Sequence, residues 1–308
     1  MRRALPACAA LALAAAALAD NEALGPKFQT LPADNPWHWD VSRHKVHPDS
    51  AKIIASMGAD TDLHPDFGKT YGIPYAVVSA KTKKQKILEW EYGDESDREP
   101  YPIPDNPPIE GGPDADGDRH ILMVDRDAGM LYELYHVFPV EKKGWKAGSG
   151  AIFNLRSNDL RPENWTSADA AGLPIFAGLV RFEEVERGLV DHAVRFTARR
   201  SRSEHWWPAR HHAGRGADPA LPPMGLRVRL KAGFEVKGYS KRNRVILEAL
   251  KRHGMILADN GSDWYMTGAP DPRWDDDDLS ELKKVKGGDF EVIRSVDEKG
   301  KPIYPPRK

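Results

Sequence analysis

The residues of this sequence best suited to chemistry lie in residues 119–137, RHILMVDRDAGMLYELYHV. Side chains alternate on either side of an Asp127-Ala128-Gly129 turn, which predicts a β-hairpin. Both faces are mostly apolar, so we expect the hairpin to be covered on both sides. If Asp125 pairs with Met130, Glu133 shares one face with four apolar residues: Leu122, Val124, Leu131 and Val137. Burial among these neighbours would raise the pKa of Glu133 and suit it to general-acid catalysis.

A glycoside hydrolase needs a second carboxylate at a set distance from its acid. Asp191 lies on another expected strand, residues 189–197, and is the better candidate for the base or nucleophile. Asp125 is a further candidate, but it lies on the opposite face of the hairpin from Glu133. The sequence therefore favours Glu133 and Asp191 as the catalytic pair.

Several acidic residues of the sequence have a simpler, structural interpretation. Glu133 could be a buried carboxylate paired with an arginine such as Arg195 or Arg229, because ion pairs also shift pKa values. Asp259 precedes Asn260-Gly261, where aspartate commonly forms turns, and we assign it to a turn. Residues 114–118, DADGD, resemble half of a calcium-binding loop, but the closing glutamate is missing and a solvated acidic turn is favoured.

Two histidines raise the alternative of a metal site. His120 lies on the more apolar face of the hairpin and could meet His192 across a sandwich of two sheets. Together with Glu133 they would form a site of two histidines and one carboxylate, which suits a metal-dependent oxidase. A histidine on an apolar strand face is more commonly a core residue with satisfied hydrogen bonds. We expect no organic cofactor, and the binding of a metal ion is kept as an alternative.

Aromatic side chains supply candidate substrate contacts. Trp206 and Trp207 lie in a long loop, residues 199–224, beside His211 and His212. These tryptophans could stack on sugar rings, although a tryptophan in a β domain is more commonly part of the core. The expected substrate-binding residues are Trp206, Trp207, Trp90, Tyr135 and Arg195.

The pattern of elements predicts a mainly β protein. Short alternating strands are interrupted by helices near residues 50–57, 179–187 and 241–253, and by long loops at 93–117 and 199–224. We expect a β-sandwich or jelly-roll-like fold with two to four inserted helices. Residues 20–47 would form an N-terminal arm, residues 48–294 a single domain, and residues 295–308 a frayed tail. The loop at 93–117 is expected to lie along one edge of a cleft.

The first 19 residues have the pattern of a secretory signal peptide. Arg2 and Arg3 precede an Ala/Leu run that ends in the small-residue site Ala17-Leu18-Ala19. Removing this segment changes the net charge from −1 to −3 and removes Cys8, the one cysteine. We therefore expect a secreted or periplasmic protein without disulfides, which binds no nucleic acid, has no membrane span and is a monomer.

Several phrases resemble a group of secreted bacterial single-domain proteins of no established activity. They are HPDFG (64–68), YGDESD (92–97), PYPIP (100–104), RPENWTSADAAGLPI (161–175), DHAVRFT (191–197) and LADNGS (257–262). The resemblance implies secretion and a single domain, and it assigns no catalytic residue. The chain lacks the G-x-S-x-G, H-E-x-x-H, Walker and dinucleotide-binding motifs.

These observations favour a secreted carbohydrate-active protein whose partner is an oligo- or polysaccharide, and specifically a glycoside hydrolase with a carboxylate pair. A non-catalytic carbohydrate-binding or envelope-associated protein is the first alternative, because the same tryptophans would serve it. The metal-dependent oxidase is the second. A mainly β fold alone does not decide among them.

The signal-peptide pattern yields the first prediction. The exported chain should begin at Asp20 and carry no thiol, because cleavage after Ala19 removes Cys8. Intact-mass measurement of the exported protein, with and without a thiol reagent, checks this. An exported species that gains the mass of the reagent would contradict it.

Overall fold

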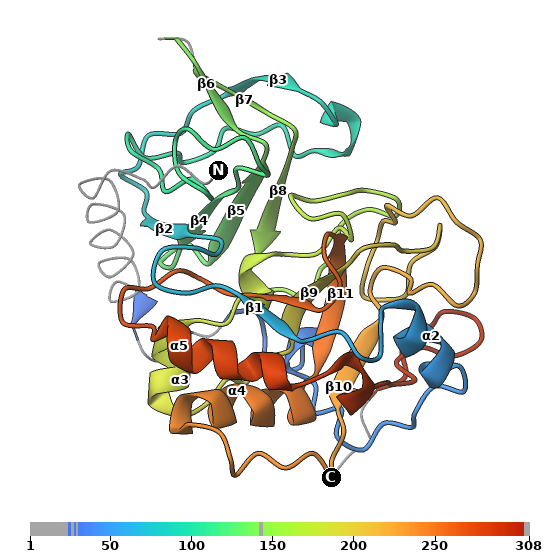
Figure 1. Cartoon of the computed structure of the whole chain (residues 1–308). Helices are drawn as coiled ribbons and strands as arrows, with labels where there is room; N and C mark the ends of the chain where they lie inside the picture. Colours follow the sequence, from blue (N-terminus) through green and yellow to red (C-terminus); the bar gives the residue numbers. More distant parts are fainter. Residues whose placement is uncertain (1–23, 26–27, 29, 142–143, 305–308) are drawn as a thin grey trace.

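The computed structural model describes residues 24–25, 28, 30–141 and 144–304. In this part of the chain thirteen strands form three sheets, accompanied by four α-helices (Figure 1). The expectation of a mainly β protein with two to four helices is confirmed, whereas a jelly-roll topology is not. None of the described helices is long and apolar enough to span a membrane. The expected signal peptide and Cys8 lie outside the described residues.

The largest sheet has six strands in the order β1-β12-β9-β11-β10-β13. Its third strand, β9, runs antiparallel to β12 and parallel to β11. Most side chains of β9, β10 and β11 are buried, as expected for strands covered on both faces. The strand bounds are His64–Asp66 (β1), Val194–Ala198 (β9), Arg227–Leu230 (β10), Met255–Asn260 (β11), Tyr265–Thr267 (β12) and Phe290–Val292 (β13).

The Asn260-Gly261 pair does not form the hairpin that its sequence predicts. The strands on either side of it, β11 and β12, are not paired with each other because β9 lies between them. The Gly261 N–H donates to the Ala198 carbonyl, so the connection crosses the end of β9. Pairing with a distant strand has overridden the local turn preference, and Asp259 lies within β11.

The second sheet has four strands in the order β2-β4-β5-β8 and contains the predicted hairpin. Asp125 is opposite Met130 and Leu122 is opposite Glu133, which confirms the predicted register. Both hairpin faces are covered, because Leu122 and its neighbours belong to the main core while the opposite face belongs to a second core. The strand bounds are Tyr75–Val78 (β2), Ile121–Asp125 (β4), Met130–Tyr135 (β5) and Ser149–Asn154 (β8).

A third sheet, β3-β7-β6, lies beyond the second at one end of the molecule, while α3, α4 and α5 lie together beside the six-stranded sheet (Figure 1). The longest helix, α4, begins after Ser240, whose hydroxyl accepts the Asn243 N–H. The strands of the third sheet are Ile87–Trp90 (β3), Phe138–Val140 (β6) and Gly144–Ala147 (β7). The described α-helices are Ser50–Ser56 (α2), Phe182–Arg187 (α3), Lys241–Arg252 (α4) and Asp276–Ser280 (α5). The described 3₁₀ helices are Pro36–His38 (η1), Gly93–Glu95 (η2), Phe176–Gly178 (η3), Glu281–Lys284 (η4) and Gly287–Asp289 (η5).

The described part of the N-terminal arm is fastened to the six-stranded sheet by Arg227. This buried guanidinium donates to the backbone carbonyls of Pro36, Trp39 and His253, and burial lowers its pKa to about 9. Residues 295–304 of the expected tail are also bonded to the body. The Ile303 carbonyl lies 3.0 Å from His44 Nε2, and the Ile303 N–H donates to the Ser295 carbonyl at 2.8 Å.

The covered hairpin yields a stability prediction. Leu122 and Leu131 are both fully buried, so replacing either with alanine should lower the free energy of unfolding by ~2 to 5 kcal/mol. Leu160→Ala is the matched control, because this leucine is exposed and its loss should cost less than about 0.5 kcal/mol. Urea unfolding of the three variants measures the difference. A cost below about 1 kcal/mol at both buried sites would mean that the hairpin does not organise the core.

Candidate functional site

A pocket of about 360 Å³ lies where the four-stranded sheet meets the six-stranded sheet. Its walls come from the ends of β5, β8 and β11, from η2, and from residues 166–170 and 211–213. This volume lies at the lower end of the range for small-molecule sites. The lining residues are Tyr92, Glu95, Asp118, Tyr135, Ser149, Thr166, Ser167, Ala168, Asp169, Ala170, His211, Ala213, Asp259 and Asn260.

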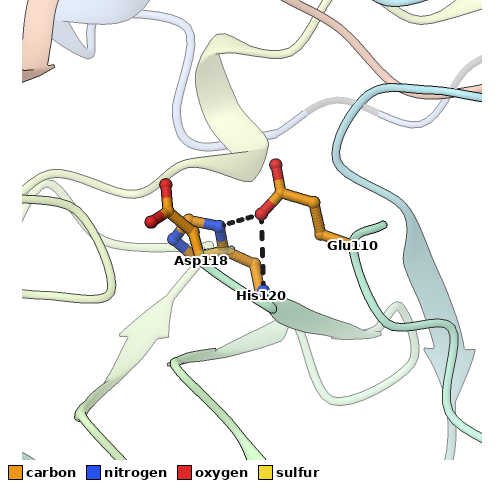
Figure 2. Close-up of side chains that lie close together, drawn as sticks. All are labelled: Glu110, Asp118 and His120. Atoms are coloured by element: carbon orange, nitrogen blue, oxygen red, sulfur yellow. Dashed lines mark hydrogen bonds and ion pairs between the residues drawn. The ribbon is translucent and has the colours of Figure 1, made fainter. Parts of the chain in front are cut away.

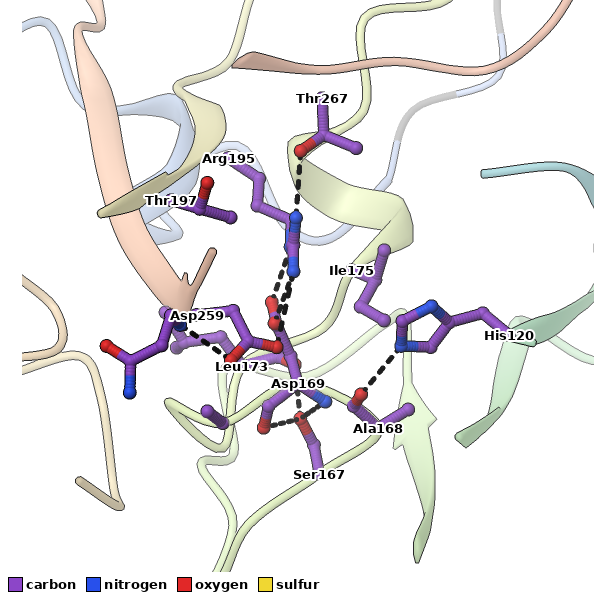
Figure 3. A network of polar contacts seen from close by, with 12 residues as sticks. His120, Ser167, Ala168, Asp169, Leu173, Ile175, Arg195, Thr197, Asp259 and Thr267 are labelled. Atoms are coloured by element: carbon purple, nitrogen blue, oxygen red, sulfur yellow. Dashed lines mark hydrogen bonds and ion pairs between the residues drawn. The ribbon is translucent and has the colours of Figure 1, made fainter. Parts of the chain in front are cut away.

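Asp169, one of the lining residues, forms a buried ion pair with Arg195 (Figure 3). Arg195 Nε donates to Asp169 Oδ2 at 2.8 Å, and its Nη2 donates to Oδ1 at 2.7 Å. Nη1 donates to the Thr267 hydroxyl at 2.8 Å. The Asp169 side chain has no exposed surface. Two buried charges are tolerated when they form a bidentate pair of this kind and the arginine makes further hydrogen bonds to other groups.

Asp259 lies beside this ion pair and faces the pocket. Its Oδ2 is 3.5 Å from Arg195 Nη2, its carboxyl lies within hydrogen-bonding reach of Asp169, and about 24% of its side chain is exposed. Burial and then the charge of Asp169 raise the pKa of Asp259 well above its usual value, and Arg195 only partly opposes them. Two carboxyl groups therefore share one cation, which favours the neutral form of Asp259.

A bulge in β11 helps to place Asp259. The pairing of β11 with β9 shifts register between Leu257 and Asp259, so Ala258 has no partner across this ladder. The Ala258 carbonyl instead accepts the Ala171 N–H at 2.8 Å. Bulges commonly re-aim side chains next to functional sites. Here the bulge joins β11 to the segment that carries Asp169.

Residues 166–173 form a tightly bonded segment that also contacts the four-stranded sheet. The Ser167 hydroxyl accepts the Asp169 N–H at 2.9 Å and lies 2.6 Å from the Leu173 carbonyl. On the other side, the Ser149 hydroxyl donates to the Ser167 carbonyl at 2.6 Å. The segment therefore holds Asp169 by backbone bonds to both sheets.

The remaining polar wall of the pocket comes from the two long loops. Glu95 in η2 accepts the Thr166 N–H at 3.1 Å, and its Oε2 lies 3.8 Å from His211 Nε2. The other nitrogen of His211 lies 2.8 Å from the Ala170 carbonyl, where it can act only as a donor. The first long loop thus borders the pocket, as the sequence predicted for residues 93–117.

Glu133 is fully buried and does not line this pocket. Its carboxylate accepts the backbone N–H groups of Ile175 at 2.9 Å and Phe176 at 2.8 Å, at the start of η3. Burial raises the pKa of Glu133 to about 7, against the effect of these two hydrogen bonds. The predicted desolvation is present, but the partners are backbone groups rather than Arg195 or Arg229. Arg195 is paired with Asp169, and Arg229 is paired with Glu291.

The other predicted catalytic acids are not brought to this site. Asp125 accepts the Ala128 N–H at 2.9 Å and so caps the turn of the hairpin. Asp191 lies next to the N-terminal arm, where its backbone carbonyl is 2.8 Å from the His38 ring. Neither residue lines the pocket, and Glu133 and Asp191 do not share it as a catalytic pair.

His120 lies at the edge of the pocket with both ring nitrogens occupied. Nδ1 is 2.6 Å from Glu110 Oε2, and Nε2 is 3.0 Å from the Ala168 carbonyl. Burial disfavours the charge on His120, but Glu110 outweighs it and raises the pKa of the imidazole to about 9. Both nitrogens then carry protons at neutral pH, and the ring is a cation that ties Glu110 to the pocket segment.

Glu110, Asp118 and His120 are also the one described group of three whose ligand atoms lie within 4.8 Å of one another (Figure 2). His192 is not part of it, because its ring nitrogens are bonded to the Ala193 carbonyl at 2.7 Å and to Glu184 at 3.2 Å. Among the described residues, His120, His192 and Glu133 therefore do not form a ligand set. A metal ion at His120 would have to displace a proton shared with Glu110.

The predicted aromatic residues separate into different places. Tyr135 lines the pocket, whereas Trp206 stacks on His47 at 5.1 Å and lines a different surface cavity. Trp207 packs on Trp39 at 5.0 Å, and Trp90 packs near Tyr101. Of the predicted substrate-binding residues, only Tyr135 lines the pocket, and Arg195 is bonded to the lining residue Asp169.

The residues that sequence reasoning missed are Asp169 and Glu95. Asp259 was assigned to a turn, and His211 was considered only as a neighbour of Trp206 and Trp207. Asp169 and Glu95 belong to the phrases RPENWTSADAAGLPI and YGDESD. Those phrases are rich in polar residues without strand or helix periodicity, which is a usable signal for functional loops.

Comparisons of the chain with protein-family models, with curated proteins and with solved structures give no match.

The buried Glu133 and His120 yield a prediction of pH-dependent stability. Both groups have a higher pKa in the folded protein than when unfolded, so the folded state binds more protons and its stability falls as pH rises. The loss from Glu133 should occur between about pH 4.5 and 7 and amount to roughly 3 kcal/mol. The loss from His120 should follow between about pH 6.5 and 9.

Glu133→Gln tests the first of these two losses. The amide mimics the neutral carboxyl and does not titrate, so the variant should show no loss of stability from this residue between pH 4.5 and 7. Its stability relative to the wild type should therefore rise across this range by up to roughly 3 kcal/mol. Glu89→Gln, an exposed matched control, should follow the wild type at every pH. Urea unfolding across this range measures the slopes. An unchanged slope between pH 4.5 and 7 in Glu133→Gln would rule out Glu133 as the titrating group.

Proposed function

We propose that the pocket binds a carbohydrate and cleaves a glycosidic bond, with Asp259 as the general acid. The observation that carries this proposal is the position of Asp259, whose carboxyl lies beside the Asp169–Arg195 ion pair and lines the cavity. Burial and the charge of Asp169 raise its pKa, which is the direction that general-acid catalysis requires. In this proposal Asp259 takes the general-acid role that the sequence predicted for Glu133.

The composition of the pocket wall supports a sugar as the ligand. Tyr92 and Tyr135 offer aromatic faces on which a pyranose ring can stack. Ser149, Thr166 and Asn260 add hydroxyl and amide groups that can bond to ring hydroxyls. Such a mixture of aromatic faces and small polar groups suits a ligand with apolar ring faces and polar edges.

In this proposal Asp259 donates its proton to the glycosidic oxygen as the bond to the anomeric carbon breaks. Asp169 acts as a positioning residue, because its charge helps to keep the proton on Asp259 and it faces Arg195 with both oxygens. Asp169 is too close to Asp259 to be the second carboxylate, since the two groups of a glycoside hydrolase lie ~5 Å or more apart.

Glu95 is the proposed base. It lines the same pocket from another loop, and its carboxylate is oriented by the Thr166 N–H and faces His211. It would remove a proton from the water that attacks the anomeric carbon, while the leaving sugar takes the proton from Asp259. The two protons balance once Glu95 returns its own to solvent and Asp259 is protonated again.

The alternative of a non-catalytic carbohydrate-binding protein uses the same pocket wall without the acid. The metal-dependent oxidase is less favoured, because His120 and His192 have protein partners on both ring nitrogens. Secretion or periplasmic residence remains part of the proposal, and it rests on the sequence of residues 1–19.

Asp259→Asn separates the enzyme from the binder. The amide keeps the size of the side chain and can still accept the Asn260 N–H, so the variant should fold with a near-native melting temperature and bind the same glycan. Its turnover should fall by at least about 10²-fold, since the acid is gone. Glycan-array binding, followed by product analysis on the bound glycans, measures both properties.

The matched control is Asp263→Asn, which follows the same strand, accepts the Arg199 N–H through Oδ1 and does not line the pocket. It should keep wild-type turnover. Binding without turnover in the wild-type protein would favour the binder, and full turnover in Asp259→Asn would move the acid to another residue.

A further inference from the structure

The pocket has an excess of carboxyl groups over cations. Four of its described lining residues are acidic, and neither lysine nor arginine occurs among them. Glu110 adds a fifth carboxylate behind the wall, bonded to His120. The acidic lining residues are Glu95, Asp118, Asp169 and Asp259.

The two buried basic side chains that are bonded to lining residues, Arg195 and His120, already have protein partners, and the lining His211 faces Glu95. Arg195 uses Nε and both terminal nitrogens on Asp169 and Thr267, with Asp259 close to one of them. His120 uses both ring nitrogens on Glu110 and the Ala168 carbonyl. A ligand carboxylate or phosphate would therefore meet acidic groups, with neither lysine nor arginine among the described lining residues to pair with.

The groups that remain are suited to a positively charged ligand. Asp118 is exposed at the mouth, whereas the half-buried Glu95 already accepts the Thr166 N–H and faces His211. Tyr92 and Tyr135 add aromatic faces, which attract ammonium groups through the ring quadrupole. Their separate places on the wall mean that an ammonium group could contact a carboxylate while the sugar ring lies on a tyrosine.

We infer that the preferred sugar carries a free amino group, so that the substrate is a cationic glycan of amino sugars. This inference rests on the proposed function, because it specifies the sugar that the pocket takes. Asp118 pairs with the ammonium group, and N-acetylation of that amine removes the charge that it recognises. Uronic acids are disfavoured because their carboxylates face like charges.

The experiment compares matched glycans that differ at one position: a free amine, an N-acetylated amine, a hydroxyl, or a carboxylate. They are presented to the full-length exported protein on an array covering several linkages, and hits are measured by calorimetry at low salt and at a pH where the amines are charged. The amine glycans should bind about fivefold or more tightly than their acetylated and hydroxyl counterparts. Added salt should reduce this preference.

One variant tests the assigned carboxylate. Asp118→Asn removes its charge and keeps the size of the side chain. It should reduce the preference for amines to about twofold while leaving binding of the hydroxyl glycans nearly unchanged. Asp116→Asn, an exposed acid of the same loop as Asp118 that does not line the pocket, should keep the full preference.

The possible failures are distinguishable. Equal or tighter binding of hydroxyl, acetylated or acidic glycans would overturn the amino-sugar inference and leave the carbohydrate function standing. An unchanged preference in Asp118→Asn would overturn the assignment to this carboxylate. Folded protein that binds no glycan of any class would overturn the inference together with the proposed function.

Discussion

The structure depends on one buried ion pair, between Arg195 on β9 and Asp169 on the loop that leads from the four-stranded sheet. Burying either charge alone would cost several kcal/mol, so each side chain requires the other in place. Because the loop is also bonded to Ser149 of β8 and to Ala258 of β11, the pair fixes how the two sheets meet. The pocket exists only where that meeting is maintained.

The same pair also sets the protonation of its neighbour. A second carboxyl group, Asp259, is placed against an arginine whose charge Asp169 has already neutralised. In such a position the neutral form of the acid is favoured. The ion pair that stabilises the junction of the sheets thereby also favours the protonated form of Asp259 at the surface of the cavity.

The sequence predicted features that depend on residues close together in the chain, but not contacts between residues far apart in it. The hairpin and the burial of Glu133 were predictable, because strand alternation is a local pattern and the register followed from the turn. The partners of Glu133 were not, since Ile175 and Phe176 are 42 and 43 residues away. Asp259 was misassigned because a strong local turn signal at Asn260-Gly261 yielded to pairing with β9. Asp169 lies in a segment without periodicity, where sequence gives no side-chain direction.

The ordering of β12, β9 and β11 has a consequence for the kinetics of folding. Arg195 reaches Asp259 across 64 positions of sequence, and the Thr166 N–H reaches Glu95 across 71. Contacts of such long range form slowly, because the chain must close large loops before they become favourable. The cavity is therefore expected to be among the last parts to assemble. A partly folded chain with both hairpin strands in place would still lack it, so recovery of ligand binding after dilution from denaturant would report completion of the native state.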